Sequence, residues 1–160
     1  MPTAKEFTAL MDDRPGTLGK ICQALADRNV NIVATQSSPI GGKSVTRFVF
    51  DNPTTARSVL EGARLIFTEA EVAQVKLAHR PGELARAAQK LGDAGININY
   101  FYCGVEPSTN APLLIFTAAP STNQWTFCAY VVNEGGGTGR DRKRIVPPFC
   151  RHKERTEIHE

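Results

Sequence analysis

Several features that identify common classes of protein are missing from this sequence of 160 residues. No apolar run approaches the roughly 18 residues of a membrane-spanning helix. Residues 1–10 lack the basic region and long apolar core of a signal peptide. The four cysteines form no CxxC pair, so reduced thiols are the simplest interpretation. We therefore expect a cytoplasmic protein with no membrane partner.

A surplus of positive charge is also missing from most of the chain. Residues 1–120 hold 12 Lys and Arg against 11 Asp and Glu, and residues 121–160 hold 7 against 5, which accounts for the overall net charge of +3. A nearly neutral first part offers no electrostatic footprint for nucleic acid. We therefore expect no nucleic-acid partner.

Motifs for catalysis and cofactor binding are missing as well. The sequence shows no nucleophile–base pair, no His/Cys cluster with zinc spacing and no phosphate-binding loop. We therefore expect that the protein is not an enzyme and uses no cofactor or metal.

What the sequence does contain is an internal duplication. Residues 12–18 (DDRPGTL) are echoed by residues 79–84 (HRPGEL), with Arg14 and Arg80 66 positions apart. Seven further identities in register exceed what chance gives, so the sequence predicts two similar units. At this offset Pro15, Gly16, Leu18, Leu25, Asp27, Asn31 and Ile32 recur as Pro81, Gly82, Leu84, Leu91, Asp93, Asn97 and Ile98.

Apolar periodicity predicts the same order of elements at the start of both units. Leu18, Ile21 and Leu25 share one face of a helix, and Asn52 followed by Pro53 is typical of a helix start. The order strand–helix–strand–strand–helix–strand favours an α+β class of tandem ferredoxin-like units, each an antiparallel sheet with helices on one face. The predicted strands are 5–11, 31–38, 45–50, 65–67, 72–77, 96–103 and 113–117, and the predicted helices are 16–28, 53–63 and 82–94.

The pattern of the repeat ends after residue 120. Residues 124–132 have strand character where the repeat predicts a helix, and a glycine run, 135–137, follows. A reading-frame shift near residue 123 and a divergent tail both explain this change. We expect a first domain over 1–69, a second domain with an atypical end over 70–132, and a mobile tail over 133–160.

Each unit carries a Pro-Gly turn between its first strand and its helix. Pro15 fixes its own φ, and Gly16 lets the backbone turn sharply. Free N–H groups at the helix start attract a small anion such as a carboxylate, and the amide of Asn31 can both donate and accept. These residues form a candidate binding site for a small molecule that carries a carboxylate and an amine. Simple turns, with Asn31 bonded to backbone, are the alternative interpretation.

The same residues resemble a known family. Residues 13–18 with 29–32, and residues 80–84 with 94–98, are similar to those of tandem ACT-domain proteins, the small-ligand-sensing modules of amino-acid metabolism. The resemblance covers about residues 5–120. It implies an amino-acid-binding regulatory protein that modulates a partner enzyme or regulator and binds its ligand where two ACT units pack together.

The resemblance also implies which residues bind the ligand. In the first unit they are Asp13, Arg14, Pro15, Gly16, Thr17, Leu18, Asn31 and Gln36, and in the second unit His79, Arg80, Pro81, Gly82, Glu83, Leu84 and Asn97. We further expect a homodimer, because the incomplete second unit leaves apolar surface. A ligand-free assembly module that acts through protein–protein contacts is the competing hypothesis.

Overall fold

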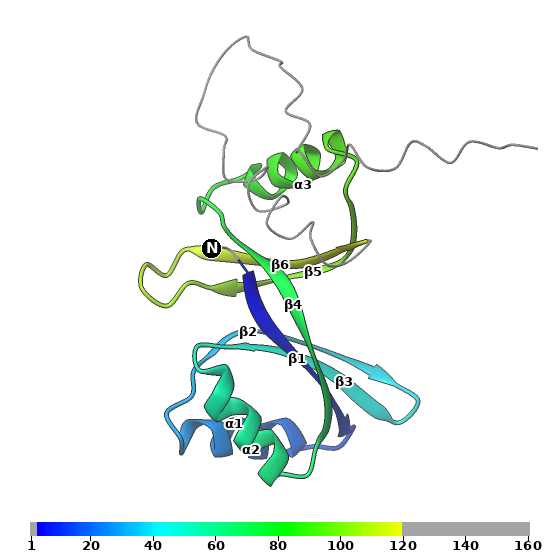
Figure 1. Ribbon diagram of the computed structural model, residues 1–160, viewed down its shortest axis with the longest axis vertical. Coiled ribbons are helices and arrows are strands. Elements are labelled where there is room, and N and C mark those ends of the chain that lie inside the picture. Colours follow the sequence, from blue (N-terminus) through cyan, green and yellow to red (C-terminus); the bar gives the residue numbers. More distant parts are fainter. Residues whose placement is uncertain (1–2, 120–160) are drawn as a thin grey trace, which may run out of the picture.

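The computed structural model describes residues 3–119, so the expectations for the C-terminal tail lie outside the described residues (Figure 1). The α+β class and the antiparallel sheet are confirmed. The elements are β1 (Thr3–Asp12), α1 (Thr17–Ala26), β2 (Ile32–Ile40), β3 (Lys43–Phe50), α2 (Pro53–Gly62), β4 (Ile66–Lys76), α3 (Glu83–Asp93), β5 (Asn97–Val105) and β6 (Pro112–Ala119).

The six strands form one sheet in the order β2-β3-β1-β4-β6-β5. Strand β4 joins the two units, because its residues Ile66–Ala73 pair with β1 and its residues Ala73–Lys76 pair with β6. The sequence predicts two separate strands here, 65–67 and 72–77. The structure has one continuous strand, since residues 68–71 also pair with β1 instead of turning. The expected domain boundary at residue 69 therefore falls inside β4.

All three helices lie on the same face of this sheet, which we call the outer face. Phe67, Ala73 and Val75 alternate along β4 and point to that face. Phe67 packs against the core under α1 and α2, whereas Ala73 and Val75 belong to the core under α3. The first core is the larger, with ring pairs such as Phe7–Phe50 at 5.4 Å between centroids.

The opposite face, which we call the inner face, is buried because the sheet curls back on itself. Val72 of β4 packs there with Val33 and Val49 of the first unit and with Leu113 and Ile115 of the second. In Figure 1 the layers follow from bottom to top as α1 and α2, the first half of the sheet, the second half, and α3. The two units thus share an apolar interface between the two halves of the sheet.

The edge strands β2 and β5 come close together at Gly104. A Cβ atom placed on Gly104 would lie 2.9 Å from the Cα atom of Ala34, and nearer still to its Cβ atom and to the carbonyl oxygen of Val33. Contacts under 3.0 Å are essentially never seen for a real Cβ atom. Only glycine therefore lets the backbones of the two strands approach this closely.

Local sequence signals agree with the element ends. Asn52 accepts a hydrogen bond from the backbone N–H of Thr55 at 3.0 Å, which confirms the predicted cap of α2 with Pro53 in its first turn. The connection between β2 and β3 is shorter than the gap between the predicted strands 31–38 and 45–50. Gly41 and Gly42 both have positive φ, at +54° and +76°, and so close a two-residue hairpin.

Candidate functional site

The two Pro-Gly turns have the same backbone geometry. Gly16 and Gly82 precede α1 and α3 in the left-handed conformation, with φ of +85° and +90°. Their hydrogen bonds also repeat at the offset of 66. Thr17 N–H donates to the carbonyl of Arg14 at 3.2 Å, and Glu83 N–H points to the carbonyl of Arg80 at 3.5 Å. The duplication therefore preserves a defined turn.

The first turn is exposed and carries an available cation. Asp13 through Gly16 are exposed, as is Leu18 at 42%, while Thr17 is half-buried. The side chain of Arg14 is 79% exposed and lies 4.0 Å from the carboxylate of Asp12. Asp12 is held instead by Lys43 at 2.5 Å, which lowers the pKa of that carboxyl. Because Thr17 N–H is already used, an incoming carboxylate would meet the N–H groups of Gly16 and Leu18.

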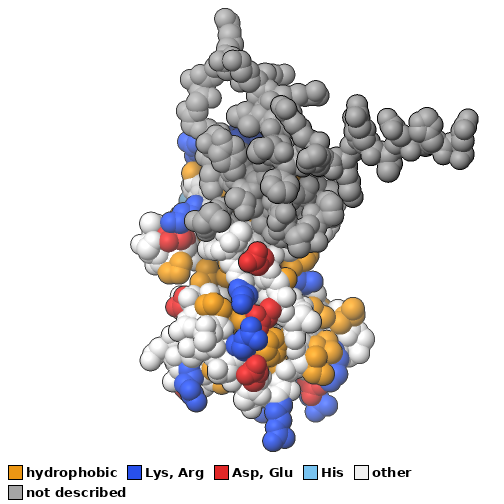
Figure 2. Space-filling model, viewed as in Figure 1, with side chains coloured by type: hydrophobic (Ala, Val, Ile, Leu, Met, Phe, Trp, Pro, Cys, Tyr) orange, Lys and Arg blue, Asp and Glu red, His pale blue; other side chains and the backbone are white. Residues whose placement is uncertain are grey.

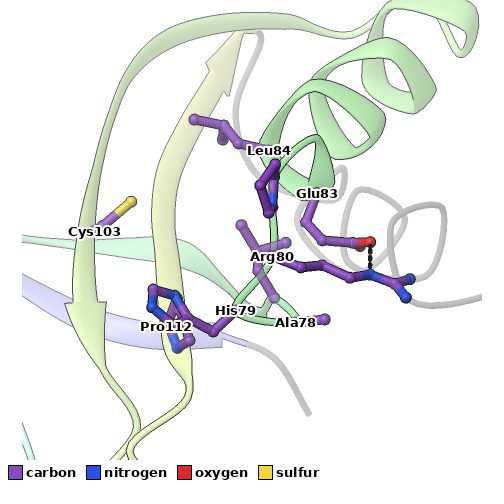
Figure 3. Close-up of a pocket in the computed structure, with 9 residues that line it drawn as sticks. Ala78, His79, Arg80, Glu83, Leu84, Cys103 and Pro112 are labelled. Atoms are coloured by element: carbon purple, nitrogen blue, oxygen red, sulfur yellow. Dashed lines mark hydrogen bonds and ion pairs between the residues drawn. The ribbon is translucent and has the colours of Figure 1, made fainter.

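The second turn borders an open pocket of about 470 Å³ (Figure 3). Small-molecule pockets typically measure roughly 300–1,000 Å³. Five of the seven residues predicted in this unit line the pocket, and Gly82 and Asn97 are not among them. The lining residues are Leu77, Ala78, His79, Arg80, Pro81, Glu83, Leu84, Cys103 and Pro112. Most of the wall is apolar, and Cys103 contributes a free thiol from strand β5.

An ion-pair network distinguishes the second turn from the first. Glu83 accepts a hydrogen bond from Arg80 Nε at 2.6 Å, the dashed line in Figure 3, and lies 3.4 Å from Arg86. The bond from Arg80 is the main cause that lowers the pKa of Glu83. Thr17 stands at the equivalent position of the first unit. The arginine of the second turn is therefore hydrogen-bonded to a carboxylate at 2.6 Å, whereas Arg14 of the first turn lies 4.0 Å from that of Asp12.

The two predicted asparagines lie far from the turn of their own unit. The backbone N–H of Asn31 donates to the side-chain Oδ1 of Asp51 at 2.9 Å, and its carbonyl accepts from the N–H of Asp51 at 3.2 Å. The first turn instead follows Asp12, which pairs with Lys43. Residues 43 and 50 are the two ends of β3, so the separation is roughly 23 Å at about 3.3 Å per residue. Asn97 pairs with Ala119, at the opposite end of β6 from the second turn.

Gln36 is also separated from the first turn. It pairs with Arg47, which in turn pairs with Thr8, five positions before Asp13 along β1. That spacing corresponds to roughly 16 Å. Gln36 instead accepts a hydrogen bond from Arg47 Nη1 at 3.3 Å, beside the interface of the two units.

The structure places a buried polar cluster in that interface, which the sequence did not indicate. Glu6 is 1% exposed and accepts hydrogen bonds from the hydroxyls of Tyr100 at 2.5 Å and Tyr102 at 2.7 Å. Arg47 Nε lies 3.8 Å from Glu6, and its guanidinium carbon lies 4.3 Å from the centre of the Tyr100 ring. The tyrosines belong to β5, so these contacts join the second unit to the first. We call Glu6, Arg47, Tyr100 and Tyr102 the Glu6 cluster.

Burial and the neighbouring carboxylate keep both tyrosines protonated. Burial, followed by the hydrogen bond to Glu6, raises the pKa of Tyr100 to about 12. The same two causes raise the pKa of Tyr102 further. Alternation of Glu6 with Phe7 along β1 could have indicated that Glu6 faces the opposite side of the sheet from the helices. Its partners lie 94 and 96 positions away, beyond any local pattern.

The described residues show few features of a membrane, metal or nucleic-acid site. Within residues 3–119 no helix is long and apolar enough to span a bilayer, and no group of three His, Cys, Asp or Glu side chains could hold a metal ion. On the face shown in Figure 2, acidic and basic side chains of the described part are mixed, with no patch of one sign. The absence of a nucleic-acid partner stays a prediction.

Fold and turns together define a class of protein: two βαββ units in one antiparallel sheet, each with a left-handed Pro-Gly turn at a helix start. Residues 7–61 match the family model of the ACT domain. Over this stretch, which makes up most of the first unit, the chain is similar to ACT domains. This match supports a regulatory role in sensing small molecules.

Solved structures share this fold across most of the chain. Protein BT0572 from Bacteroides thetaiotaomicron has a TM-score of 0.70 at 20% identity, covering 83% of this chain and 88% of that one. The ligand-free regulatory subunit of aspartate kinase from Thermus thermophilus has a TM-score of 0.57 at 20% identity, covering 82% and 90%. E. coli aspartokinase III in complex with lysine and aspartate has a TM-score of 0.50 at 13% identity, covering 81% and 30%. These likenesses show the fold, and no curated protein matches the sequence.

Proposed function

We propose that this chain is a regulatory protein that binds a free amino acid at its Pro-Gly turns and modulates a partner enzyme or regulator of amino-acid metabolism. The observation that carries the proposal is the repeated turn within an ACT fold, with identical backbone hydrogen bonds and, in the second unit, an adjoining pocket of about 470 Å³. The proposed role is regulatory and not catalytic. The aspartate kinase regulatory subunit among the similar folds supports that part of the proposal.

The proposed mode of binding differs at the two turns. At the first turn, the N–H groups of Gly16 and Leu18 and the exposed Arg14 would receive the carboxylate, because the helix start is positive and Asp12, 4.0 Å from Arg14, is bound more closely by Lys43. At the second turn, Glu83 already occupies Arg80. The apolar wall there would take the side chain of the ligand, with an aliphatic or small side chain favoured.

The positions of the two asparagines suggest that each binding site contains residues of both units. Figure 1 shows the start of β2, which follows Asn31, on the same side of the molecule as the turn before α3. We propose that Asn31 contributes to the ligand site at the second turn and that Asn97 contributes to the site at the first turn. This arrangement agrees with the expectation that ACT ligands bind where two units pack together.

A thermal-shift screen of the full-length chain with each of the twenty amino acids tests the function. A ligand at about 100 times its dissociation constant adds about 2.7 kcal/mol to the free energy of unfolding. Leu18→Arg and Leu84→Arg form a matched pair, because the two leucines are equivalent in the repeat and are 42% and 40% exposed. The variant that loses the shift identifies the turn that binds.

The competing hypothesis of a ligand-free assembly module requires no such shift. If no amino acid raises the melting temperature of the wild-type chain, the sensor hypothesis falls. The expected homodimer is tested by light scattering. Leu10 and Ile66, which pair across β1 and β4 and are 39% and 74% exposed, support it as apolar surface.

A further inference from the structure

The Glu6 cluster contains a carboxylate oxygen, Oε1, that accepts a long hydrogen bond from the hydroxyl of Thr8 at 3.4 Å and for which Tyr100 and Arg47 are the two stronger donors. Oε1 of Glu6 accepts the hydroxyl of Tyr100 at 2.5 Å and also faces Arg47 Nε at 3.8 Å, too far for a hydrogen bond. Arg47 Nε is buried and has no hydrogen-bond partner among the described residues. A buried charged donor without a partner is costly. Arg47 would therefore gain by moving onto Glu6.

Tyr100 occupies Oε1 of Glu6 and keeps Arg47 from bonding to it. Its hydroxyl occupies Oε1, and its ring lies against the guanidinium, 4.3 Å from ring centre to guanidinium carbon. The hydrogen bond that Arg47 donates to Gln36 Oε1 is weak, since it is 3.3 Å long. Tyr102 is different, because it donates to the other oxygen, Oε2, for which Arg47 does not compete.

The two donors belong to different units, which gives the competition a structural consequence. Glu6 and Arg47 both lie in the first unit, on β1 and β3, whereas Tyr100 lies on β5 of the second. A Tyr100–Glu6 bond fastens β5 to β1. A direct Arg47–Glu6 hydrogen bond would satisfy the same oxygen within the first unit and remove one of the two bonds between β5 and Glu6, with Tyr102 still on Oε2. Strand β5 also carries Cys103, which lines the pocket at the second turn.

We propose that Tyr100 and Arg47 exchange on Oε1 of Glu6, and that this exchange couples occupancy of the Pro-Gly turns to the packing of the two units. The coupling to a ligand rests on the proposed function; the exchange itself does not. Tyr100 and Arg47 are positioning residues, which act through β5 on the pocket. Two discrete arrangements of one cluster supply the two-state element that a regulatory domain needs.

A double-mutant cycle on the full-length chain tests the exchange. The urea unfolding of Arg47→Met is measured in the wild-type chain and in the Tyr100→Phe background. If the donors compete, Arg47→Met costs more in the Tyr100→Phe background, because there Arg47 has closed onto Glu6. An equal or smaller cost overturns the exchange. Tyr102→Phe is the matched control and should leave the cost of Arg47→Met unchanged.

NMR of the Arg47 side chain gives a second readout that does not depend on stability. In Tyr100→Phe the hydrogen exchange of Arg47 Nε–H should slow by about tenfold or more, since the group gains a partner. Unchanged exchange overturns the proposal.

The coupling is tested with the twenty amino acids as probes. For an amino acid that binds the wild-type chain, Tyr100→Phe should change the dissociation constant by about fivefold or more, and an unchanged constant overturns the coupling. If no amino acid binds the wild-type chain, the proposed function fails, and the mutant cycle alone decides the exchange.

Discussion

Replacing Gly104 with alanine should loosen the contact between the two units. The added Cβ atom would sit 2.9 Å from Ala34 Cα and closer to Ala34 Cβ and the Val33 carbonyl oxygen, whereas carbon atoms pack best at about 3.5–4.0 Å. Two of the three obstructing atoms belong to backbone, so no side chain can swing away. Strands β2 and β5 must separate instead.

The expected cost is at the upper end of what overpacking causes, about 2–3 kcal/mol. For a chain of this size that corresponds to a fall in melting temperature of about 5–10 °C. Urea unfolding measures it as a lower midpoint with an unchanged slope. Adding Ala34→Gly to Gly104→Ala should recover part of the loss, because it removes one of the three obstructing atoms.

Gly19→Ala is the matched control. Gly19 lies inside α1 with nothing within 4 Å of an added Cβ atom and without a positive φ. Alanine there should stabilise the chain by about 0.5–1 kcal/mol. If Gly104→Ala behaves like Gly19→Ala, strands β2 and β5 do not approach closely at Gly104, and the packing of the two units differs from that described above.

Three further predictions address the turn and the Glu6 cluster. Gly16→Ala should lower the free energy of unfolding by about 1–2 kcal/mol in urea, because alanine is strained at a φ of +85°; a neutral result would contradict the left-handed turn. Tyr102→Phe should cost about 1.5–3 kcal/mol by the same assay, because it removes a bond to the buried carboxylate of Glu6; a loss within error would place Glu6 in contact with water. Tyr100 should ionise near pH 12 in the folded chain, followed by phenolate absorbance and absent in Tyr100→Phe. Since the pKa of Tyr100 is raised above 10.0 in the folded chain, the contribution of Tyr100 to stability is full below about pH 10 and is lost as the pH rises towards 12. Ionisation of Tyr100 at the ordinary pKa would refute the burial of its hydroxyl.

The sequence by itself determined the features that depend on neighbours along the chain. The offset of 66 predicted two units, and the Pro-Gly pairs predicted turns that the structure shows with the same backbone bonds. Asn52 and Pro53 predicted the start of α2, and apolar spacing predicted the buried face of α1 at Ile21 and Leu25, although Leu18 of the same face is 42% exposed. These signals are readable because a turn, a cap or an amphipathic face is specified by residues within a few positions of one another.

The tertiary structure alone decided what depends on register between distant strands. It made β4 one strand that serves both units, placed Asn31 and Asn97 away from the turns of their own units, and brought Glu6 to two tyrosines more than 90 positions later. No local pattern contains this information, because strand pairing and the curl of the sheet bring together residues that are far apart in the chain. The physical reason is that the inner face becomes an interface only when both halves of the sheet exist, so its partners are set by the assembled fold.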